Sequence, residues 1–426
     1  MTINDSRRRN CRTTCRGERK SMAIIKLFSG SHCLHEEVVR NIIETTGYQK
    51  ITDQDVVQTS AKLSSMSEMK LFRAFAARES VFNKFTREKE TAVAHLKLAL
   101  SHLLDKNEFI ISGYSALLLP RKISHAIGVC LIADLQSRIS NAVERELLSR
   151  KEAQKSIRRS DRDCAAWTNL LFNMDDPWNP SLHDMVIPMD KKKPEEAANT
   201  IIQNAAKDAI RATSDSNQAI IDFRLATEVD VALARSGHHC GVDADAGEIT
   251  LTINRPVLVL NRLEEELKSL VEKIPGVSAV NTVVGKSFHQ SSIYRKHDFE
   301  LPSKVLLVDD EREFVETLSE RLQIRDVGAA VAYDAKSAMA VVAQDEPDVM
   351  IIDLKMPGID GMEMLQRIKQ TRPNIEVIVL TGHGSRDDQE QCMAMGAFAY
   401  LQKPVNIDEL GDILKKAHAK INSGQE

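Results

Sequence analysis

The stretch Asp348–Gly361, DVMIIDLKMPGIDG, decides the fold of the last quarter of the chain. Its apolar run, Val349–Ile352, predicts a short buried strand, and the Pro-Gly pair after Asp353 predicts a loop at the end of that strand. Three further apolar runs end in polar residues in the same way, in KVLLVDDE (304–311), EVIVLTG (376–382) and AFAYLQKPV (397–405). Helical patterns separate the four runs, which is typical of β-α units that form a parallel sheet.

The residues that end these strands are polar, and they are Asp309, Asp310, Asp353, Thr381 and Lys403. In an open α/β sheet the functional crevice lies at the carboxyl ends of the strands, so we expect these side chains to converge. Several carboxylates at one place repel each other unless a hard cation joins them, and Mg²⁺ prefers oxygen ligands. The pattern therefore predicts a Mg²⁺ site made by Asp309, Asp310, Asp353 and the backbone carbonyl of Lys355.

The same residues suit phosphoryl transfer to Asp353. An aspartate at a strand-loop junction has room to attack as a nucleophile. Charge spreads over the phosphoryl oxygens during the transfer, and a metal ion neutralises part of it. Lys403 would add a second cation and Thr381 a hydroxyl donor. We therefore predict that Asp353 is the phosphoacceptor and that Thr381 and Lys403 are the other catalytic residues.

Written as DD, D-x-K-M-P-G-x-D-G, T-G and K-P, these residues resemble the receiver domain of response regulators, the CheY-like (βα)5 doubly wound fold. The resemblance covers residues 304–420. It implies that a sensor histidine kinase phosphorylates Asp353 and that the Lys403–Pro404 peptide is cis. It also implies a conformational switch, in which the bound phosphoryl group draws Thr381 inward and frees space for the Tyr400 ring.

The composition fits a multidomain protein of the cytoplasm. A length of 426 residues allows several domains. A formal net charge of −4 provides no field that would gather nucleic acid, and the seven cysteines include no CxxC pair, which is typical of reduced thiols. No apolar run reaches the roughly 18 residues of a membrane-spanning helix. We therefore expect a cytoplasmic protein without direct DNA binding, and membrane association is not favoured.

Residues 1–21 form a basic tail, with seven basic and two acidic residues and without the apolar segment of a secretory signal. A basic arm for nucleic acid or lipid is one interpretation. A disordered tail, or translation that starts naturally at Met22, explains the composition as well, because a strand-like run follows Met22 directly.

Residues 22–212 alternate helical patterns with short apolar runs and predict an α/β domain. The segment opens as strand, glycine-containing loop and helix, which is the order of a phosphate-binding loop. Later come EFIISGYSALL, GVCLIAD, the charged run EAQKSIRRSDRDCAAW and HDMVIPMD. In that order they resemble the cytidylate-kinase-like family, a P-loop-kinase-like α/β fold. The resemblance implies that nucleotide phosphates are contacted by Arg138 and by the lid arginines Arg158, Arg159 and Arg162.

The loop departs from the pattern that kinase chemistry requires. A working loop reads G-x-x-x-x-G-K-[ST], in which backbone amides cradle the phosphates while the Lys and the hydroxyl meet the γ-phosphate and Mg²⁺. Phe28–His35, FSGSHCLH, keeps one glycine and lacks the Lys and the hydroxyl at its closing positions. We therefore expect an inactive kinase-like domain. Retained nucleotide binding, a sensor role and a docking or dimer surface are left open.

Two histidine–cysteine groups, Ser31–His35 and His238–Cys240, offer soft ligands that could hold zinc or copper. Neither group has the paired spacing of a metal site with a second cluster, so solvated side chains are the favoured interpretation.

Residues 218–286 show a smaller α+β pattern. The expected strands are VDVALA (229–234), EITLTI (248–253) and VNTVVG (280–285), with an amphipathic helix over 259–274. Gly247, Pro275-Gly276-Val277 and Val280-Asn281 resemble the signature of the BON domain, a family linked to membranes and small ligands. Because no export signal precedes it, a spacer or dimerisation module is the favoured alternative. Residues 287–303 are polar and without period, which predicts a linker.

The whole pattern predicts a multidomain α/β response regulator whose receiver state controls the kinase-like and BON-like regions, with homodimer formation left open. One alternative is a nucleotide kinase of the cytidylate type gated by its own receiver, against which the incomplete loop argues. Another is a scaffold with a receiver that no longer turns over, against which the complete acidic site argues. No helix-turn-helix follows the receiver pattern, so we expect no direct action as a transcription factor.

Overall fold

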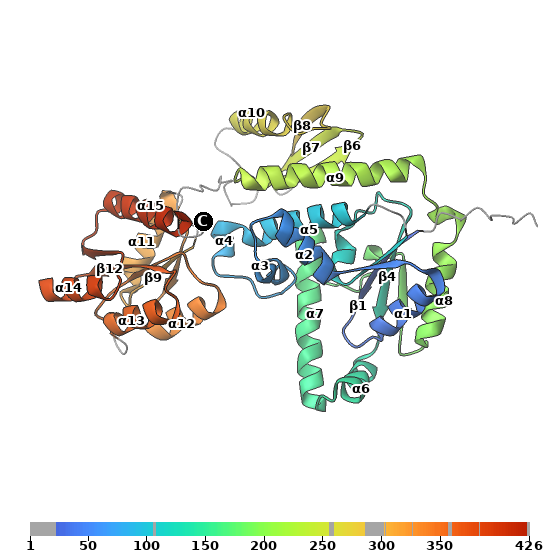
Figure 1. Ribbon diagram of the computed structural model, residues 1–426, viewed down its shortest axis with the longest axis horizontal. Coiled ribbons are helices and arrows are strands. Elements are labelled where there is room, and N and C mark those ends of the chain that lie inside the picture. Colours follow the sequence, from blue (N-terminus) through green and yellow to red (C-terminus); the bar gives the residue numbers. More distant parts are fainter. Residues whose placement is uncertain are drawn as a thin grey trace, which may run out of the picture. The chain divides into compact units, whose positions relative to one another are not determined.

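The computed structural model describes residues 23–104, 108–254, 260–285, 302, 304–325, 327–356, 360–382 and 384–423 (Figure 1). The predicted basic tail, the Pro357-Gly358 pair and nearly all of the predicted linker lie outside these residues. The chain divides into two compact units. The first comprises Met1–Asp53, Leu104–Arg158 and Trp178–Ala219, and the second comprises Gln54–Leu103, Arg159–Pro177 and Ile220–Glu426. Of the helices that the structure describes, none is long and apolar enough to cross a membrane.

The first unit is built around a parallel five-stranded sheet with the strand order β2-β3-β1-β4-β5. Its strands are β1 (Ile24–Ser29), β2 (Gln49–Thr52), β3 (Phe109–Ser112), β4 (Ala126–Ile132) and β5 (Met185–Pro188). Because β3 lies on one side of β1 and β4 on the other, the loop after β1 emerges where the strand order reverses. Ligands bind at such switch points in α/β proteins.

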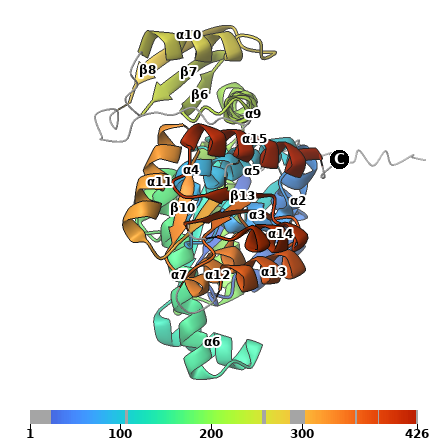
Figure 2. The same ribbon diagram turned by 90° about the vertical axis from the view of Figure 1, so that its left-hand side faces the viewer.

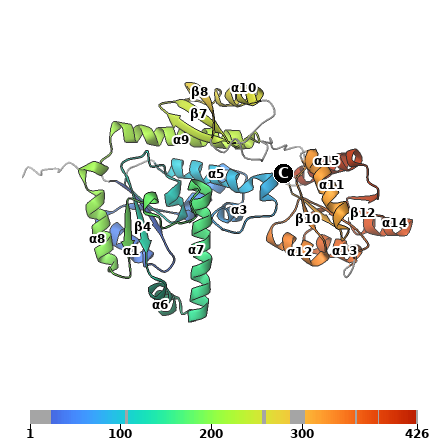
Figure 3. The same cartoon turned by 180° about the vertical axis from the view of Figure 1, so that it is seen from behind.

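Helices α1 (His35–Thr46) and α8 (Pro194–Ala205) lie side by side on one face of this sheet, as Figures 1 and 3 show. Their apolar stripes form one buried cluster with the strands, in which Val39 and Ile201 meet Leu27 of β1. Helix α6 (Leu135–Glu146) follows β4. Its N-cap is Asp134, whose side chain accepts a hydrogen bond from the Ser137 N–H.

The second unit contains a helical part and two smaller sheets. The helices are α3 (Glu68–Arg73), α4 (Asn83–Thr86) and α5 (Glu88–Leu103), together with most of α2 (Asp53–Leu63) and α7 (Arg150–Phe172). Trp167 of α7 is fully buried and packs edge-on against Phe75, with ring centroids 5.0 Å apart.

The middle region forms a three-stranded sheet with the order β6-β7-β8. Its elements are α9 (Ser214–Arg235), β6 (Gly241–Asp245), β7 (Glu248–Ile253), α10 (Leu260–Val271) and β8 (Ala279–Val284). β6 is antiparallel to β7, and α10 connects β7 to the parallel strand β8. The predicted strands at 248–253 and 280–285 are therefore confirmed to within one residue at their ends, and the predicted helix is confirmed but ends three residues earlier, at Val271.

The predicted strand VDVALA (229–234) is wrong, because these residues form the last turns of α9. Val229 and Leu233 lie one helical turn apart, with Leu225 one turn earlier, and all three are buried against Ile249 and Leu251 of β7. β-branched residues favour strands only weakly, and burial of this helical stripe decides the conformation.

The receiver pattern folds into a parallel sheet with the order β10-β9-β11-β12-β13. The strands are β9 (Val305–Val308), β10 (Ala329–Ala332), β11 (Val349–Ile352), β12 (Glu376–Thr381) and β13 (Ala399–Gln402). The helices are α11 (Arg312–Ile324), α12 (Ala335–Gln344), α13 (Gly361–Thr371), α14 (Arg386–Ala394) and α15 (Ile407–Ser423). Figure 2 shows α11 and α15 on one face and α12 and α13 on the other, in agreement with two separate core clusters.

Candidate functional site

Three carboxylates gather at the carboxyl edge of the receiver sheet. Asp309 and Asp310 follow β9, and Asp353 follows the neighbouring parallel strand β11. Oxygens from the three side chains lie within 4.8 Å of one another. Asp309 and Asp353 are 4% and 6% exposed, whereas Asp310 is exposed. We call these three residues the acidic pocket, which opens to solvent at Asp310.

Backbone groups hold the two buried carboxylates. Oδ1 of Asp309 accepts from the Glu311 N–H at 2.9 Å, and Oδ1 of Asp353 accepts from the Leu354 N–H at 2.8 Å. Leu354 is in turn tied to the start of α13, where the Gly361 N–H donates to the Leu354 carbonyl at 2.9 Å. A Cβ on Gly361 would overlap the carbonyl oxygen of Asp353, so this position needs a glycine.

Lys403, which follows β13, reaches both buried carboxylates. Its Nζ lies 2.7 Å from Oδ2 of Asp309 and 3.7 Å from Oδ2 of Asp353. Burial opposes the positive charge, but the hydrogen bond to Asp309 and the charges of both carboxylates outweigh it and raise the pKa of Lys403. Burial raises the pKa of Asp309, against the opposing effect of Lys403. The peptide between Lys403 and Pro404 is cis, as predicted.

The donor set of the acidic pocket fits Mg²⁺. The ion prefers carboxylate and carbonyl oxygens and keeps several of its waters, which an opening on one side allows. Lys403 neutralises one of the three carboxylate charges, so negative charge remains for a divalent cation. Lys355 is exposed and lies two residues after Asp353, and the role of its carbonyl as a ligand stays a prediction.

Thr381 and Tyr400 lie on the neighbouring strands β12 and β13, with Tyr400 in register with Val379, two residues before Thr381. Thr381 is buried, and its carbonyl accepts from the Lys403 N–H at 2.9 Å. The buried hydroxyl of Tyr400 has no hydrogen-bond partner in the part of the chain that the structure describes. A Cβ on Gly384 would lie 2.9 Å from Cγ2 of Thr381 and would overlap the Tyr400 hydroxyl. Gly384 therefore makes room for the Tyr400 ring beside Thr381.

Two residues at the start of α11 complete the surroundings of Lys403, and the sequence reasoning did not single them out. Glu311 Oε1 lies 3.2 Å from Lys403 Nζ, and the Phe314 ring centroid lies 4.4 Å from the same atom. The place of Glu311 directly after the acidic pair, with Phe314 one turn later on the same helical face, is the signal that could have found them.

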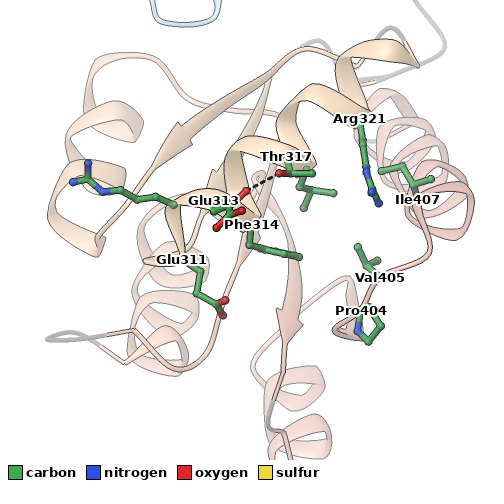
Figure 4. Close-up of a pocket in the computed structure, with 10 residues that line it drawn as sticks. Glu311, Glu313, Phe314, Thr317, Arg321, Pro404, Val405 and Ile407 are labelled. Atoms are coloured by element: carbon green, nitrogen blue, oxygen red, sulfur yellow. Dashed lines mark hydrogen bonds between the residues drawn. The ribbon is translucent and has the colours of Figure 1, made fainter.

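A groove of about 620 Å³ continues from these residues. Figure 4 shows Phe314 and Arg321 of α11 on one side, opposite Pro404, Val405 and Ile407 on the way into α15. The lining thus combines an apolar centre with charged residues. Glu311 lines the groove and also contacts Lys403, so the groove lies next to the acidic pocket.

The loop after β1 keeps the strand-loop-helix arrangement of a phosphate-binding loop but not its side chains. Leu34 has φ 57° and directly precedes α1. A glycine would adopt this left-handed backbone at lower cost. His35 and Glu36 open α1 directly after Leu34, so the loop leads into the helix without the Lys and the Ser or Thr of the motif.

His35 is tied to two serines. Its Nδ1 lies 2.9 Å from the Ser29 hydroxyl, and its Nε2 lies 2.6 Å from the Ser112 hydroxyl. Burial lowers the pKa of His35 to about 4, so the ring is neutral near pH 7. A neutral imidazole held in this way supplies no cation to a γ-phosphate.

Of the arginines predicted to contact nucleotide phosphates, Arg138 on α6 reaches the loop. Its Nε donates to the Ser31 carbonyl and one Nη to the Ser31 hydroxyl, both at 2.9 Å. Arg158, Arg159 and Arg162 are exposed on α7. Phosphate binding by these four residues stays a prediction.

Neither histidine–cysteine group gathers a set of metal ligands. Among the described residues, the acidic pocket is the single place where three or more His, Cys, Asp or Glu side chains bring their ligand atoms together. His238 is buried with Nε2 3.3 Å from Glu266 Oε1. Burial raises the pKa of the Cys240 thiol to about 12, so it stays protonated.

Comparison with known proteins supports two of the resemblances. Residues 305–415 match the family model of the response regulator receiver domain, and residues 29–191 match that of the cytidylate kinase-like family. Sporulation initiation phosphotransferase F of Bacillus subtilis is 34% identical over 113 residues, which are 26% of this chain and 91% of that protein.

Other relatives match over the same region. The C4-dicarboxylate transport transcriptional regulatory protein DctD of Pseudomonas aeruginosa is 34% identical over 119 residues, which are 28% of this chain and 26% of that protein. The chain thus spans about a quarter of the length of this regulator. A solved response regulator receiver domain protein from Clostridium thermocellum is 33% identical, with coverage of 28% of this chain and 96% of that chain and a TM-score of 0.27.

A parallel sheet with helices on both faces, and with clustered aspartates and a lysine at its carboxyl edge, defines the class of receiver domains. The chain belongs to the response regulator receiver family. Its N-terminal region is similar to the cytidylate kinase-like family.

Proposed function

We propose that this chain is a two-component response regulator whose Asp353 accepts a phosphoryl group from a sensor histidine kinase. One observation carries the proposal. Oxygens of Asp309, Asp310 and Asp353 lie within 4.8 Å of one another, and Lys403 Nζ lies 2.7 Å from the first and 3.7 Å from the last. This arrangement supplies a nucleophile, ligands for a divalent cation and a second cation at one place, as phosphoryl transfer requires.

In the proposed transfer, an oxygen of Asp353 forms a bond to phosphorus while the bond between phosphorus and the donor's histidine nitrogen breaks. The imidazole leaves with the bonding electron pair and takes up a proton. Mg²⁺ held by the acidic pocket would neutralise charge on the phosphoryl oxygens. Lys403 is placed to pair with the phosphoryl group once Asp353 carries it, and the Thr381 hydroxyl would donate to another phosphoryl oxygen.

Thr381 and Tyr400 are the proposed switch. The Tyr400 hydroxyl and the Thr381 methyl already share the small space left by Gly384. A Thr381 side chain drawn toward the phosphoryl group would change that space, and the population of Tyr400 ring positions would shift with it.

The groove between α11 and the segment after Lys403 supports a kinase partner. Its apolar centre, which includes Phe314 and Ile407, offers a footing for a helix of the donor. Glu311 lines the groove and contacts Lys403, so a helix seated there would bring its phosphohistidine close to Asp353. A partner of this kind acts in the cytoplasm, where we expect the chain to work.

We further propose that the receiver state acts on the kinase-like and middle regions and that the kinase-like domain no longer transfers phosphoryl groups. The loop after β1 lacks the Lys of the motif, and the neutral His35 at the start of α1 supplies no cation in its place, which supports loss of that activity. The order β7-α10-β8, with parallel strands joined by a crossover helix, supports the BON-like interpretation of the middle region. A spacer or dimerisation role for this region remains our favoured reading.

The test is incubation of the purified chain with acetyl phosphate and MgCl₂, followed by intact mass measurement. We expect a single phosphoryl adduct, its absence in Asp353→Asn, and its retention in the control Asp360→Asn. Asp360 is a matched control because it is exposed and caps α13 nearby through the Met362 N–H. An adduct that persisted in Asp353→Asn, or no adduct on the folded wild-type chain, would contradict the proposal.

A further inference from the structure

The receiver has a second contact surface at the opposite edge of its sheet from the acidic pocket. Lys304 directly precedes β9 and Asp309 directly follows it, so about 16 Å separates them at a rise of about 3.3 Å per residue. Asp345 lies at the end of α12, and its Oδ2 is 3.0 Å from Lys304 Nζ. Lys304 and Asp345 are 5% and 4% exposed. We call this the amino-terminal edge of the receiver.

Charged and polar groups of residues 73–88, which lead from α3 to α5, contact this edge within the same compact unit. Arg73 donates to Oδ1 of Asp345 at 2.9 Å, and the Ser80 hydroxyl donates to its Oδ2 at 2.6 Å. Lys304 donates to Glu88 at 2.7 Å. Burial opposes the charge of Asp345, but the Ser80 hydrogen bond and Lys304 outweigh it and lower the pKa of this carboxyl.

Aromatic side chains of the same segment enter the receiver. Phe82 is fully buried and belongs to a receiver core cluster with Leu306 and Ala330. The Phe85 ring packs on Gly328, just before β10, so closely that a Cβ on Gly328 would overlap the ring. A receiver core position is thus filled by a side chain from the kinase-like part of the sequence.

The segment is also tied to α7. The Ala77 N–H donates to Oδ1 of Asp163 at 2.7 Å, and Phe75 packs edge-on against Trp167. Residues 73–88 therefore connect the receiver to the helix that carries the predicted lid arginines Arg159 and Arg162.

We propose that the amino-terminal edge of the receiver is a docking site for the chain's own segment Arg73–Glu88. The docked segment leaves the carboxyl edge free, so a phosphodonor reaches Asp353 while the segment stays bound. This contact is the route by which the receiver acts on the helical part of the kinase-like domain, and that role rests on the proposed function. The docking itself does not rest on the proposed function, because it involves neither Mg²⁺ nor phosphorylation.

The test is hydrogen–deuterium exchange of the full chain without phosphodonor. Gly328→Ala places a methyl group against Phe85 from the receiver side, and Phe82→Leu weakens the packing from the segment side. Gly411→Ala on α15 is the control, because a Cβ there meets nothing within 4 Å. If the segment is docked, Gly328→Ala and Phe82→Leu should each speed hydrogen–deuterium exchange by roughly tenfold. The faster exchange should occur both in the segment, at residues 78–88, and in the receiver, at the end of α12.

The strand β12 serves as the internal reference, since its exchange should stay at the wild-type rate in every variant whose receiver remains folded. If Gly328→Ala unfolds the receiver, the exchange of the Phe82→Leu variant tests the proposal. Faster exchange confined to the mutated side, or wild-type exchange of residues 78–88 in a folded variant, would overturn the proposal. No phosphodonor is present in this experiment. A result against docking can therefore be told apart from a failure of Asp353 to form the phosphoryl adduct.

Discussion

Lys403 and Mg²⁺ should compete for the same carboxylate, and Lys403→Met tests this directly. Lys403 Nζ lies 2.7 Å from Oδ2 of Asp309, an oxygen that the acidic pocket would offer to the metal. A hydrogen bond to a charged group contributes about 1.5–3 kcal/mol, and each 1.4 kcal/mol is about tenfold in affinity. Because the variant also removes a positive charge beside the ion, we expect Mg²⁺ to bind roughly ten- to a hundredfold more tightly.

The assay is calorimetric titration of Mg²⁺, carried out at pH 8 because burial raises the pKa of Asp309. Lys369→Met is the matched control, since it also removes a lysine that is ion-paired to a buried carboxylate, Glu376, but away from the acidic pocket. Its Mg²⁺ affinity should equal that of the wild type. Equal or weaker binding in Lys403→Met would refute the reasoning, because it would mean that Lys403 does not occupy a metal ligand.

Three further expectations rest on single contacts. Gly384→Ala should drive the Tyr400 ring outward because the added methyl overlaps its hydroxyl, and the ring should become accessible to solvent in a proton NMR spectrum. Gly361→Ala should displace the backbone of Asp353 and Leu354 and lower the free energy of unfolding in urea by about 1–3 kcal/mol, with slower adduct formation on Asp353. The first unit should lose stability as pH falls from 6.5 to 4, because unfolded His35 takes up a proton at its ordinary pKa of 6.5 and the folded residue only at about 4. The loss is on the order of 2 kcal/mol for this partly exposed ring, and His35→Gln should flatten the slope.

Much of the receiver sheet could be predicted from the sequence because its strands are buried on both faces. Such strands read as unbroken apolar runs, as in Val349–Ile352, and polar residues mark where each one ends. The prediction failed at residues 229–234, where a run rich in Val and Ala fits a strand locally. Those residues are helical because Val229 and Leu233 continue an apolar stripe that begins at Leu225. Packing of this stripe against β7 stabilises the helix.

The acidic pocket could be foreseen for the same reason, since parallel strands bring their carboxyl ends to one edge. What could not be foreseen are contacts that depend on side-chain reach. The Glu311 contact with Lys403 and the space beside Gly384 need the positions of two loops that lie far apart in the sequence. The contact of Phe82 with the receiver core needs a tertiary fold, because nothing in the local pattern of residues 80–86 distinguishes it from a loop.

The loop after β1 and the acidic pocket both resemble phosphate-handling sites, but the charge at the acidic pocket suits its task and the charge at the loop does not. The loop after β1 lacks the Lys and the hydroxyl of the motif, and α1 begins directly after it with a neutral His35 and the carboxylate of Glu36. Each missing charge-assisted donor forfeits about 1.5–3 kcal/mol of phosphate binding, and the nearby Arg138 already donates to Ser31. At the acidic pocket, by contrast, the negative charge is arranged to attract a divalent cation, and Lys403 stands beside it. We therefore expect phosphoryl chemistry in this chain at the receiver, and we expect any nucleotide held by the kinase-like domain to act there as a ligand and not as a substrate.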